Sequence, residues 1–307
     1  GLEVGLNYDR DFGPWQMGLI GLVNRRTYLS TEDVDIEDGF GALLEQQFQE
    51  VDQESGETIL RGSLARSITS RHRIEFGAEA AFNTLDQSLS FIYDVGGGPV
   101  TVSIPNSNVL VEEERAELFG SHTWQPADRW SVESRLAWET STLTFTGDAD
   151  QTVELSFWKP SIQLSHTIGA NNQLRFRLYR DVGQLDFGDF VSAASVADAL
   201  IDGGNPDLVP QTAWIAELGA DLRFGSAALG LTLSHHRLSD VADLVKIVDD
   251  NGTPGNPADD ITFDAPGNIG DGEITRLDVN LSMPVSFIPG GRLTIEGFLR
   301  DTEVTDP

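Results

Sequence analysis

The 307 residues contain no cysteine, no run of about 18 apolar residues and few basic residues. Without cysteine the chain can form no disulfide, no thiolate zinc site and no cysteine nucleophile. The nearest approach to a long apolar run, at 17–23, is too short for a transmembrane helix. Only 20 Lys and Arg residues stand against 49 Asp and Glu residues, which gives a formal net charge of −29. This balance excludes nucleic-acid binding, because neutralising phosphates requires clustered basic side chains.

Motifs for enzymatic chemistry are also missing. The sequence has no GxSxG, P-loop or GxGxxG motif, and no histidine lies in HExxH or a comparable metal-ligand spacing. The five histidines are His72, His122, His166, His235 and His236. The last two are adjacent, so on a strand they would face opposite sides and could not share a metal. We therefore predict that the protein is not an enzyme and needs no cofactor.

Alternation of apolar and polar residues is what the sequence has in abundance. At 72–82, for example, Ile74 and Phe76 would point to one side of a strand while Arg73 and Glu75 point to the other. With 16 Phe, 6 Trp and 4 Tyr residues the chain is too aromatic to be disordered, so it should fold. Helical spacing of apolar residues occurs only at 190–201. The pattern therefore predicts an all-β chain with 12 strands and one short helix at most. The strands are predicted at 2–9, 15–28, 57–69, 72–93, 109–124, 130–146, 152–168, 173–185, 212–224, 227–248, 273–287 and 292–303.

The predicted connections alternate between tight and long. Tight turns lie at 11–14, 70–71, 126–129, 169–172, 225–226 and 288–291. Long polar connections fill 29–56, 94–108, 186–211 and 249–272, with a shorter one at 147–151. This sorting is typical of an antiparallel up-and-down transmembrane β-barrel in an outer membrane, which has short periplasmic turns and long external loops. A soluble sandwich, the alternative for such strands, has no reason to sort its loops in this way.

Aromatic and charged residues fit the same interpretation. Aromatics near the tight turns fit a girdle at the level of the lipid headgroups. They are Trp15, Trp124, Trp130, Phe224 and Phe287. The polar strand faces carry both signs of charge, which suits a wet lumen with ion pairs between strands. We expect Arg175, Arg177, Arg180 and Arg223 to form a basic patch inside. As candidates for contact with a solute we name Arg175, Arg177, Tyr179 and Arg223.

One segment resembles a known family. Residues 204–218 read GNPDLVPQTAWIAEL, and this is similar to the Asn-Pro-x-Leu-x-Pro-Glu segment of the TonB-dependent outer-membrane receptors, which leads from an external loop into a descending strand. Gln211 stands where the family usually has Glu. The proline residues hold the backbone extended, so we interpret the matching positions as structural. These positions are Asn205, Pro206, Asp207, Leu208 and Pro210.

The resemblance also implies a larger architecture. In this family 22 strands close around an N-terminal plug, and the TonB protein of the inner-membrane motor pulls on a short segment of the plug. The present chain begins inside a predicted strand and offers 12 strands. Residues 1–307 are therefore interpreted as a partial β-barrel domain, without the plug and without the C-terminal strands. We expect it in the outer membrane of a Gram-negative bacterium, in contact with lipid.

Two acidic stretches fall in predicted external loops, at 31–38 and 249–260. The second offers hard oxygen ligands that calcium could use, but in an order that lacks the pattern and closing Glu of an EF-hand. A solvated loop is the favoured interpretation. The weak calcium candidates are Asp249, Asp250, Asp259 and Asp260.

Two functions of different classes follow for an outer-membrane barrel. The favoured one is an active transport receptor, in which external loops capture a scarce solute and the TonB system supplies the energy for import. The solute could be a siderophore, a vitamin or an oligosaccharide. The alternative is a passive porin-like or adhesive barrel without a plug. A third reading, a soluble β-sandwich binding protein, predicts solubility without detergent.

Overall fold

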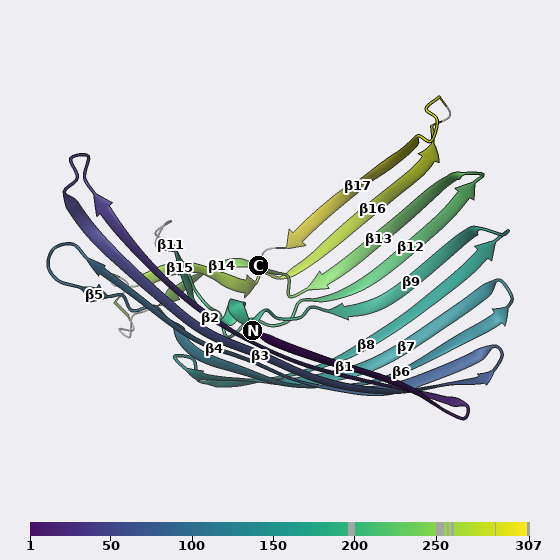
Figure 1. Cartoon of the computed structure of the whole chain (residues 1–307), viewed down its shortest axis with the longest axis horizontal. Helices are drawn as coiled ribbons and strands as arrows, with labels where there is room; N and C mark the ends of the chain where they lie inside the picture. Colours follow the sequence, from purple (N-terminus) through teal and green to yellow (C-terminus); the bar gives the residue numbers. More distant parts are fainter. Residues whose placement is uncertain (196–199, 250–254, 257, 259–260, 286, 306–307) are drawn as a thin grey trace.

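The computed structural model describes residues 1–195, 200–249, 255–256, 258, 261–285 and 287–305, and strands dominate them (Figure 1). The strands are β1 Leu2–Phe12, β2 Trp15–Glu37, β3 Leu43–Thr69, β4 His72–Asp94, β5 Val100–Thr101, β6 Asn108–Ala127, β7 Trp130–Gly147, β8 Gln151–Ile168, β9 Asn172–Val182, β10 Ala193–Ser195, β11 Leu200–Asp202, β12 Thr212–Phe224, β13 Ala227–Ser239, β14 Ala242–Asp249, β15 Ile261–Asn268, β16 Asp271–Pro284 and β17 Arg292–Thr305. One 3-10 turn, η1, spans Phe187–Phe190.

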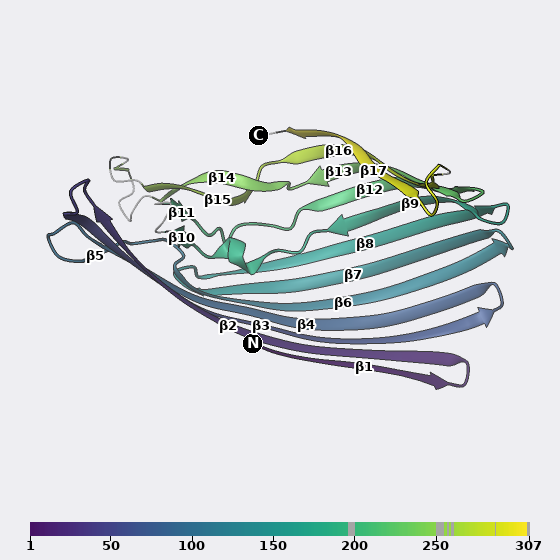
Figure 2. The same ribbon diagram turned by 45° about the horizontal axis from the view of Figure 1, so that its top comes forward.

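Neighbours in sequence are neighbours in the main sheet. Its continuous path runs β1-β2-β3-β4-β6-β7-β8-β9-β12-β13-β16-β17, with the two-residue β5 paired to β4. Every pair along the path is antiparallel. The prediction of an up-and-down antiparallel sheet of 12 strands is thereby confirmed. The sheet bends into a trough with β1 and β17 as its edge strands (Figure 2). A small second sheet, in the order β10-β11-β15-β14, lies at one end of the trough.

The two faces of the main sheet differ in chemistry because successive side chains point to opposite sides. The register places Ala78, Leu118 and Trp138 in one row across β4, β6 and β7. The next row, on the opposite face, joins the glutamates at 79, 117 and 139. The apolar face is solvent-exposed along most strands, with Leu118 55% exposed. A broad exposed apolar face is unusual for a soluble protein and is typical of the lipid side of a membrane barrel. We call this the outer face, and the concave charged face the inner face.

The tight connections all lie at one end of the sheet (Figure 1, right). They join β1 to β2, β3 to β4, β6 to β7, β8 to β9, β12 to β13 and β16 to β17. Gly225, in the two-residue turn after β12, has φ +63°, a left-handed conformation that glycine adopts without steric cost. The long connections lie at the other end, as the loop sorting predicts.

Aromatic and histidine side chains ring the outer face near the tight turns. Trp130 stacks on His166 with ring centroids 4.0 Å apart. On the neighbouring strands His72 stacks on His122 and on Trp124. Trp138 lies on the same face of β7, eight residues beyond Trp130 and away from the tight turn. At about 3.3 Å per residue the two tryptophans are roughly 26 Å apart along the strand. At a tilt of about 40° this separation corresponds to an apolar band of about 20 Å, close to the roughly 25 Å of outer-membrane barrels.

Trp130→Ala is expected to lower the free energy of unfolding by about 2 kcal/mol, because it removes both the His166 stack and an interfacial anchor. Denaturant titration of the protein reconstituted in bilayers measures this change. Ser131→Ala, at the next position on the inner face, is the control and should leave stability nearly unchanged. Equal stability of the two variants would contradict the anchoring role.

The predicted long connection at 29–56 is wrong. Strand β2 continues to Glu37 and β3 begins at Leu43, and the two pair along this whole extension. The acidic stretch 31–38 therefore lies largely in a strand and not in a loop. Backbone pairing needs no apolar face once the hairpin projects beyond the lipid, so hydrophobic alternation could not indicate it.

One further prediction is wrong for the described residues. The single strand predicted at 227–248 is divided into β13 and β14, because Asp240 adopts φ +58° and breaks the strand. The helical spacing at 190–201 corresponds to no α-helix among the described residues, which form β10 and β11 there, with 196–199 outside the described residues. Phe190 and Val191 are buried against the main sheet, and this packing overrides the local spacing. None of the described segments forms a helix of the length and apolarity that crossing a membrane requires.

Candidate functional site

Between β9 and β12, residues 183–195 and 200–211 fold onto the inner face, and we call these two stretches the infolded segment. Its ends meet where the Gly183 N–H donates to the Gln211 carbonyl at 2.8 Å. Asp186 is the N-cap of the turn η1, and its Oδ1 accepts from the Gly188 N–H at 2.9 Å. This cap and the closed ends give the segment a defined shape over the trough.

A hydrophobic core holds the infolded segment to the wall. Phe190 is 0% exposed and meets Phe145 of β7 edge to face, with centroids 5.0 Å apart. The other buried members are Leu85, Val109, Val111, Leu143, Ala149, Val191 and Leu208. The core therefore joins the segment to β4, β6 and β7.

Side-chain amides of the wall satisfy the backbone of the segment. Gln87 of β4 donates to the Ser192 carbonyl at 2.7 Å, and Gln49 of β3 donates to the Ala194 carbonyl at 2.8 Å. Asn106 donates to the Gly204 carbonyl at 2.9 Å. Buried backbone carbonyls need such partners, so these bonds fix the position of the segment as well as its attachment.

The segment that carries the family resemblance, 205–210, lies at the end of the infolded segment. Asn205 accepts from the Asp207 N–H at 3.0 Å in a local turn and donates to the Pro266 carbonyl at 2.8 Å. The Pro206 carbonyl accepts from the Gln151 amide at 2.7 Å, and Leu208 lies in the core. These contacts tie the segment to β8 and β15. Pro210 lines the cavity described next.

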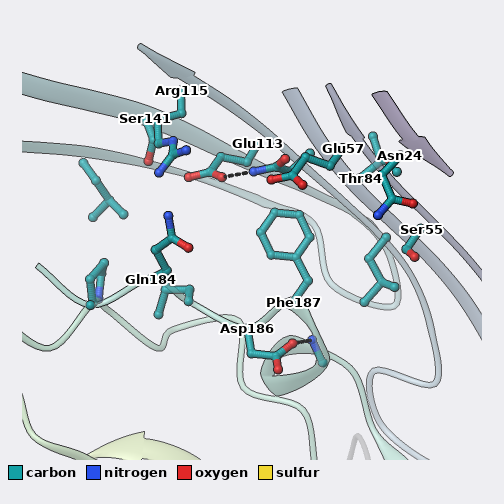
Figure 3. A pocket seen from close by; sticks show the side chains of 18 of the residues that line it. Asn24, Ser55, Glu57, Thr84, Glu113, Arg115, Ser141, Gln184, Asp186 and Phe187 are labelled. Carbon is teal, nitrogen blue, oxygen red and sulfur yellow. Dashed lines mark hydrogen bonds between the residues drawn. The ribbon is translucent and has the colours of Figure 1, made fainter. Parts of the chain in front are cut away.

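A cavity of about 670 Å³ separates the infolded segment from the wall (Figure 3). From the segment, Gln184, Asp186 and Phe187 line it. From the wall, polar side chains dominate: Asn24, Arg26, Gln53, Ser55, Glu57, Asn83, Glu113, Arg115, Glu139 and Ser141. Its size and partly enclosed shape match those of small-molecule sites.

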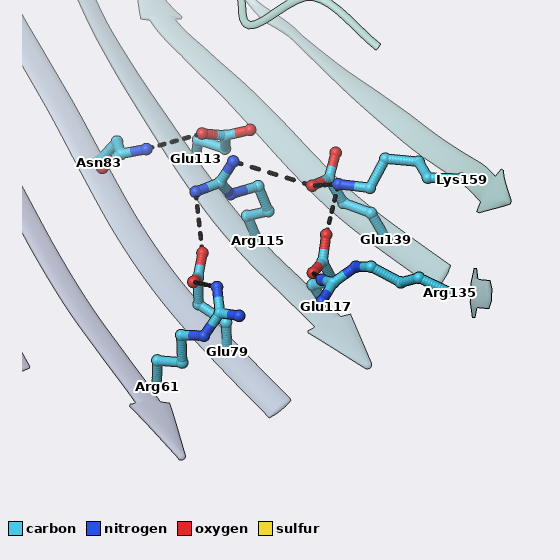
Figure 4. Close-up of polar contacts among 9 residues, drawn as sticks. All are labelled: Arg61, Glu79, Asn83, Glu113, Arg115, Glu117, Arg135, Glu139 and Lys159. Carbon is cyan, nitrogen blue, oxygen red and sulfur yellow. Dashed lines mark hydrogen bonds and ion pairs between the residues drawn. The ribbon is translucent and has the colours of Figure 1, made fainter. Parts of the chain in front are cut away.

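A network of ion pairs continues from the cavity toward the tight turns (Figure 4). The Glu79 carboxylate forms ion pairs with Arg61 and Arg115, with N···O distances of 3.4 Å and 3.3 Å. The Glu117 carboxylate pairs with Arg135 at 2.8 Å and also with Lys159. Glu139 connects the two groups, because it pairs with Lys159 at 2.8 Å and with Arg115 at 3.8 Å. Four cations and three carboxylates from the five adjacent strands β3, β4, β6, β7 and β8 are thus held in place on the inner face.

Three of the four sequence-predicted contact residues lie together on β9. Arg175 pairs with Asp221 at 2.8 Å, and the Arg177 guanidinium lies 4.0 Å from the centre of the Tyr179 ring. Arg223 faces the same side, but it stands next to the tight turn after β12, away from the other three. Arg180 was expected in the same basic patch, and this is wrong. It alternates to the outer face and donates to the Trp158 carbonyl at 3.4 Å.

The weak calcium candidates fall mostly outside the described residues. Asp249 ends β14, while Asp250, Asp259 and Asp260 are not described. Within the described part of the chain, no group of three or more His, Asp or Glu side chains could hold a metal ion.

Local contacts shift the pKa values of two carboxylates that lie outside the strands, Asp38 and Asp189. The pKa of Asp38, in the exposed β2–β3 turn, is lowered because its carboxylate accepts the N–H groups of Ala42 and Phe40. The pKa of Asp189, in η1, is raised by partial burial and by the nearby charge of Asp186. Asp38 follows β2 at the end of that strand away from its tight turn, and Asp189 lies in the connection between β9 and β12.

Sequence reasoning missed the cavity. Asn24 and Glu57 alternate with apolar residues and could have been assigned to an inner face from periodicity. Gln184 and Phe187, however, lie in a connection whose folding inward depends on contacts with strands far away in sequence. No local signal indicates such contacts.

Comparison with known proteins identifies the fold. Residues 1–302 match the family model described as TonB dependent receptor-like, beta-barrel. No curated protein matches the sequence.

Solved structures are similar at low identity. The ferric yersiniabactin uptake receptor FyuA from Yersinia pestis shares 13% identity at a TM-score of 0.63, over 99% of this chain and 42% of the receptor. The ferripyoverdine receptor of the outer membrane of Pseudomonas aeruginosa shares 13% at 0.61, over 92% of this chain and 38% of the receptor. The ferric citrate transporter FecA shares 12% at 0.60, over 99% of this chain and 42% of the transporter. At these identities the likeness concerns the fold, and the chain spans less than half the length of each of these proteins.

Proposed function

Because the chain belongs to the TonB-dependent receptor-like β-barrel family, we propose that it forms part of the wall of an active transport receptor. Members of this family lie in the outer membrane of Gram-negative bacteria, and so does this chain. In the proposal the external end binds a scarce small solute, and energy from the TonB system drives its import. Residues 1–307 are a partial β-barrel domain, and the plug on which the TonB protein acts belongs to the rest of the receptor.

One observation carries the proposal. The infolded segment encloses a polar cavity against the inner face, on the side of the ion-pair network that faces away from the tight turns. A passive pore needs an open lumen, whereas a receptor needs a shaped site on the external side. The positions of the segment and the cavity favour the receptor.

Uptake by cells that carry the full-length receptor tests the proposal. A panel of ferric chelates, cobalamin and oligosaccharides is supplied to cells with and without the tonB gene. We expect receptor-dependent accumulation of one class, and its loss when TonB is absent. Accumulation that is unchanged without TonB would indicate the passive barrel instead.

The β9 residues give a second, local test of solute contact. In the proposal Arg175, Arg177 and Tyr179 contact the passing solute, and replacing each by Ala weakens uptake. Arg223→Ala belongs to the same series, and its place beside the turn predicts the smallest effect. Unchanged uptake in a variant that is inserted normally removes that residue from the solute path.

A further inference from the structure

The cavity under the infolded segment adjoins a second, smaller hollow on the inner face. A second hollow of about 260 Å³ is lined by Arg26, Gln53 and Ser55, which also line the cavity, and by Tyr28. Both hollows follow β2 and β3 on the inner face, toward the extended hairpin. The shared residues make them one groove, which runs along β2 and β3 from Asn24 and Glu57 to Tyr28.

Acidic groups outnumber basic groups along this groove. Arg26 and Arg115 stand against Glu57, Glu113, Glu139 and Asp186, a formal balance of 2 − 4 = −2. Arg115 is moreover held by ion pairs with Glu79 and Glu139. An anionic solute would meet like charge in a partly enclosed site, and this is costly. The lining therefore favours a neutral solute over an anionic metal chelate.

The remaining polar groups offer donors and acceptors side by side. Amides come from Asn24, Gln53 and Gln184, and hydroxyls from Ser55 and Ser141. A hydroxyl group both donates and accepts, so a ligand rich in hydroxyls is the chemical complement of such a lining.

Asn83 shows the need for such a ligand most clearly. Its Nδ2 donates to Glu113 at 2.8 Å, while its buried Oδ1 has no hydrogen-bond partner among the described residues. An unsatisfied buried acceptor costs free energy, and a rotation of the side chain that turns Oδ1 into the groove would let a ligand hydroxyl donate to it.

Two aromatic rings complete the groove. The Phe187 ring projects from the infolded segment toward the polar wall (Figure 3), and Tyr28 lies in the second hollow. Aromatic faces pack on the apolar C–H faces of sugar rings, and a tyrosine adds a hydroxyl for hydrogen bonding. Two rings at separate points along one groove suit a solute built of several rings.

We propose that this groove binds a neutral, chain-like polyhydroxylated solute, an oligosaccharide of several sugar units. The inference rests on the proposed transport function and specifies the substrate class of the same site. The carboxylates and amides bind the hydroxyl groups, and Tyr28 and Phe187 each stack on a sugar ring.

Calorimetric titration of the purified full-length receptor in detergent tests the inference. The probes are maltohexaose, cellohexaose and xylohexaose, with hexagalacturonate and ferric citrate as anionic comparisons. We expect one neutral hexasaccharide to bind at micromolar concentration, and hexagalacturonate to bind at least about tenfold more weakly or not at all. Asn24→Ala and Tyr28→Ala should weaken binding of the neutral probe by about tenfold or more. Thr27→Ala, on the opposite face of the same strand, is the matched control and should leave binding unchanged.

Several outcomes would overturn the inference. These are tighter binding of ferric citrate or hexagalacturonate than of any neutral probe, no binding of any hexasaccharide, or full binding in both groove variants. TonB-dependent uptake of a ferric chelate by the same receptor would refute the oligosaccharide as substrate and would still support the proposed transport function. Binding of a hexasaccharide whose uptake does not need TonB would support the substrate class and refute the proposed energised transport.

Discussion

Phe190→Ala is expected to detach the infolded segment from the inner face and to lower the free energy of unfolding by about 3–5 kcal/mol. Phe190 is fully buried, and its ring meets both Phe145 and Phe187. Removing it leaves a cavity at the centre of the core that joins the segment to three strands. Hydrogen exchange of residues 187–195 should become faster, because the segment then opens without unfolding of the sheet.

The matched control is Phe40→Ala. Phe40 lies in the β2–β3 turn and is 99% exposed, so the same chemical change there should alter stability by less than about 0.5 kcal/mol. If both variants have the stability and exchange rates of the parent protein, the segment is not held by this core. Solute binding in Phe190→Ala should fall together with protection of the segment, since the segment supplies one side of the cavity.

Glu117→Leu is expected to cost about 3 kcal/mol of stability, because it leaves Arg135 without an ion-pair partner in the described part of the chain and removes one of the two partners of Lys159. Arg135 and Lys159 both contact the Glu117 carboxylate, whose side chain is only 12% exposed. Lys159 keeps Glu139 as a partner, whereas Arg135 has no other ion pair among the described residues. Denaturant unfolding in bilayers measures the loss.

A double variant separates charge from packing. Glu117→Leu combined with Arg135→Leu should recover part of the lost stability, because the stranded cation is then removed. Glu133→Leu is the control, since Glu133 is an exposed inner-face carboxylate of β7 with no ion pair among the described residues. A loss in Glu133→Leu equal to that in Glu117→Leu would show that the network contributes nothing specific.

The strands could be predicted because their signal is local. Each lipid-crossing stretch alternates every second residue between a polar and an apolar environment, and that period is visible in one sequence. The extended hairpin of β2 and β3 gives no such signal, because its residues are largely polar on both faces and backbone pairing defines it. The helical spacing at 190–201 is misleading for a related reason, since burial of Phe190 against distant strands decides the local conformation.

Residues of the candidate site could be predicted only where their position in a strand determines which face of the sheet they occupy. Arg175, Arg177 and Tyr179 were correctly assigned to one face of β9, because alternate residues of a strand must share it. The error at Arg180 came from neglecting that same alternation. The cavity combines β2, β3, β4, β6, β7 and β8 with a connection that follows β9. Its existence depends on strand order and on the inward folding of that connection, which only tertiary structure provides.

The central claim is that the two faces of the sheet meet different surroundings, with lipid outside and an aqueous path inside. Because the 307 residues contain no cysteine, single cysteines on β9 can report on each face without interference from these residues. In intact outer membranes, a charged maleimide should label cysteines at Arg175 and Arg177. It should not label cysteines at Leu174, Phe176 and Leu178. Equal labelling at all five positions, or labelling confined to the second group, would contradict the account.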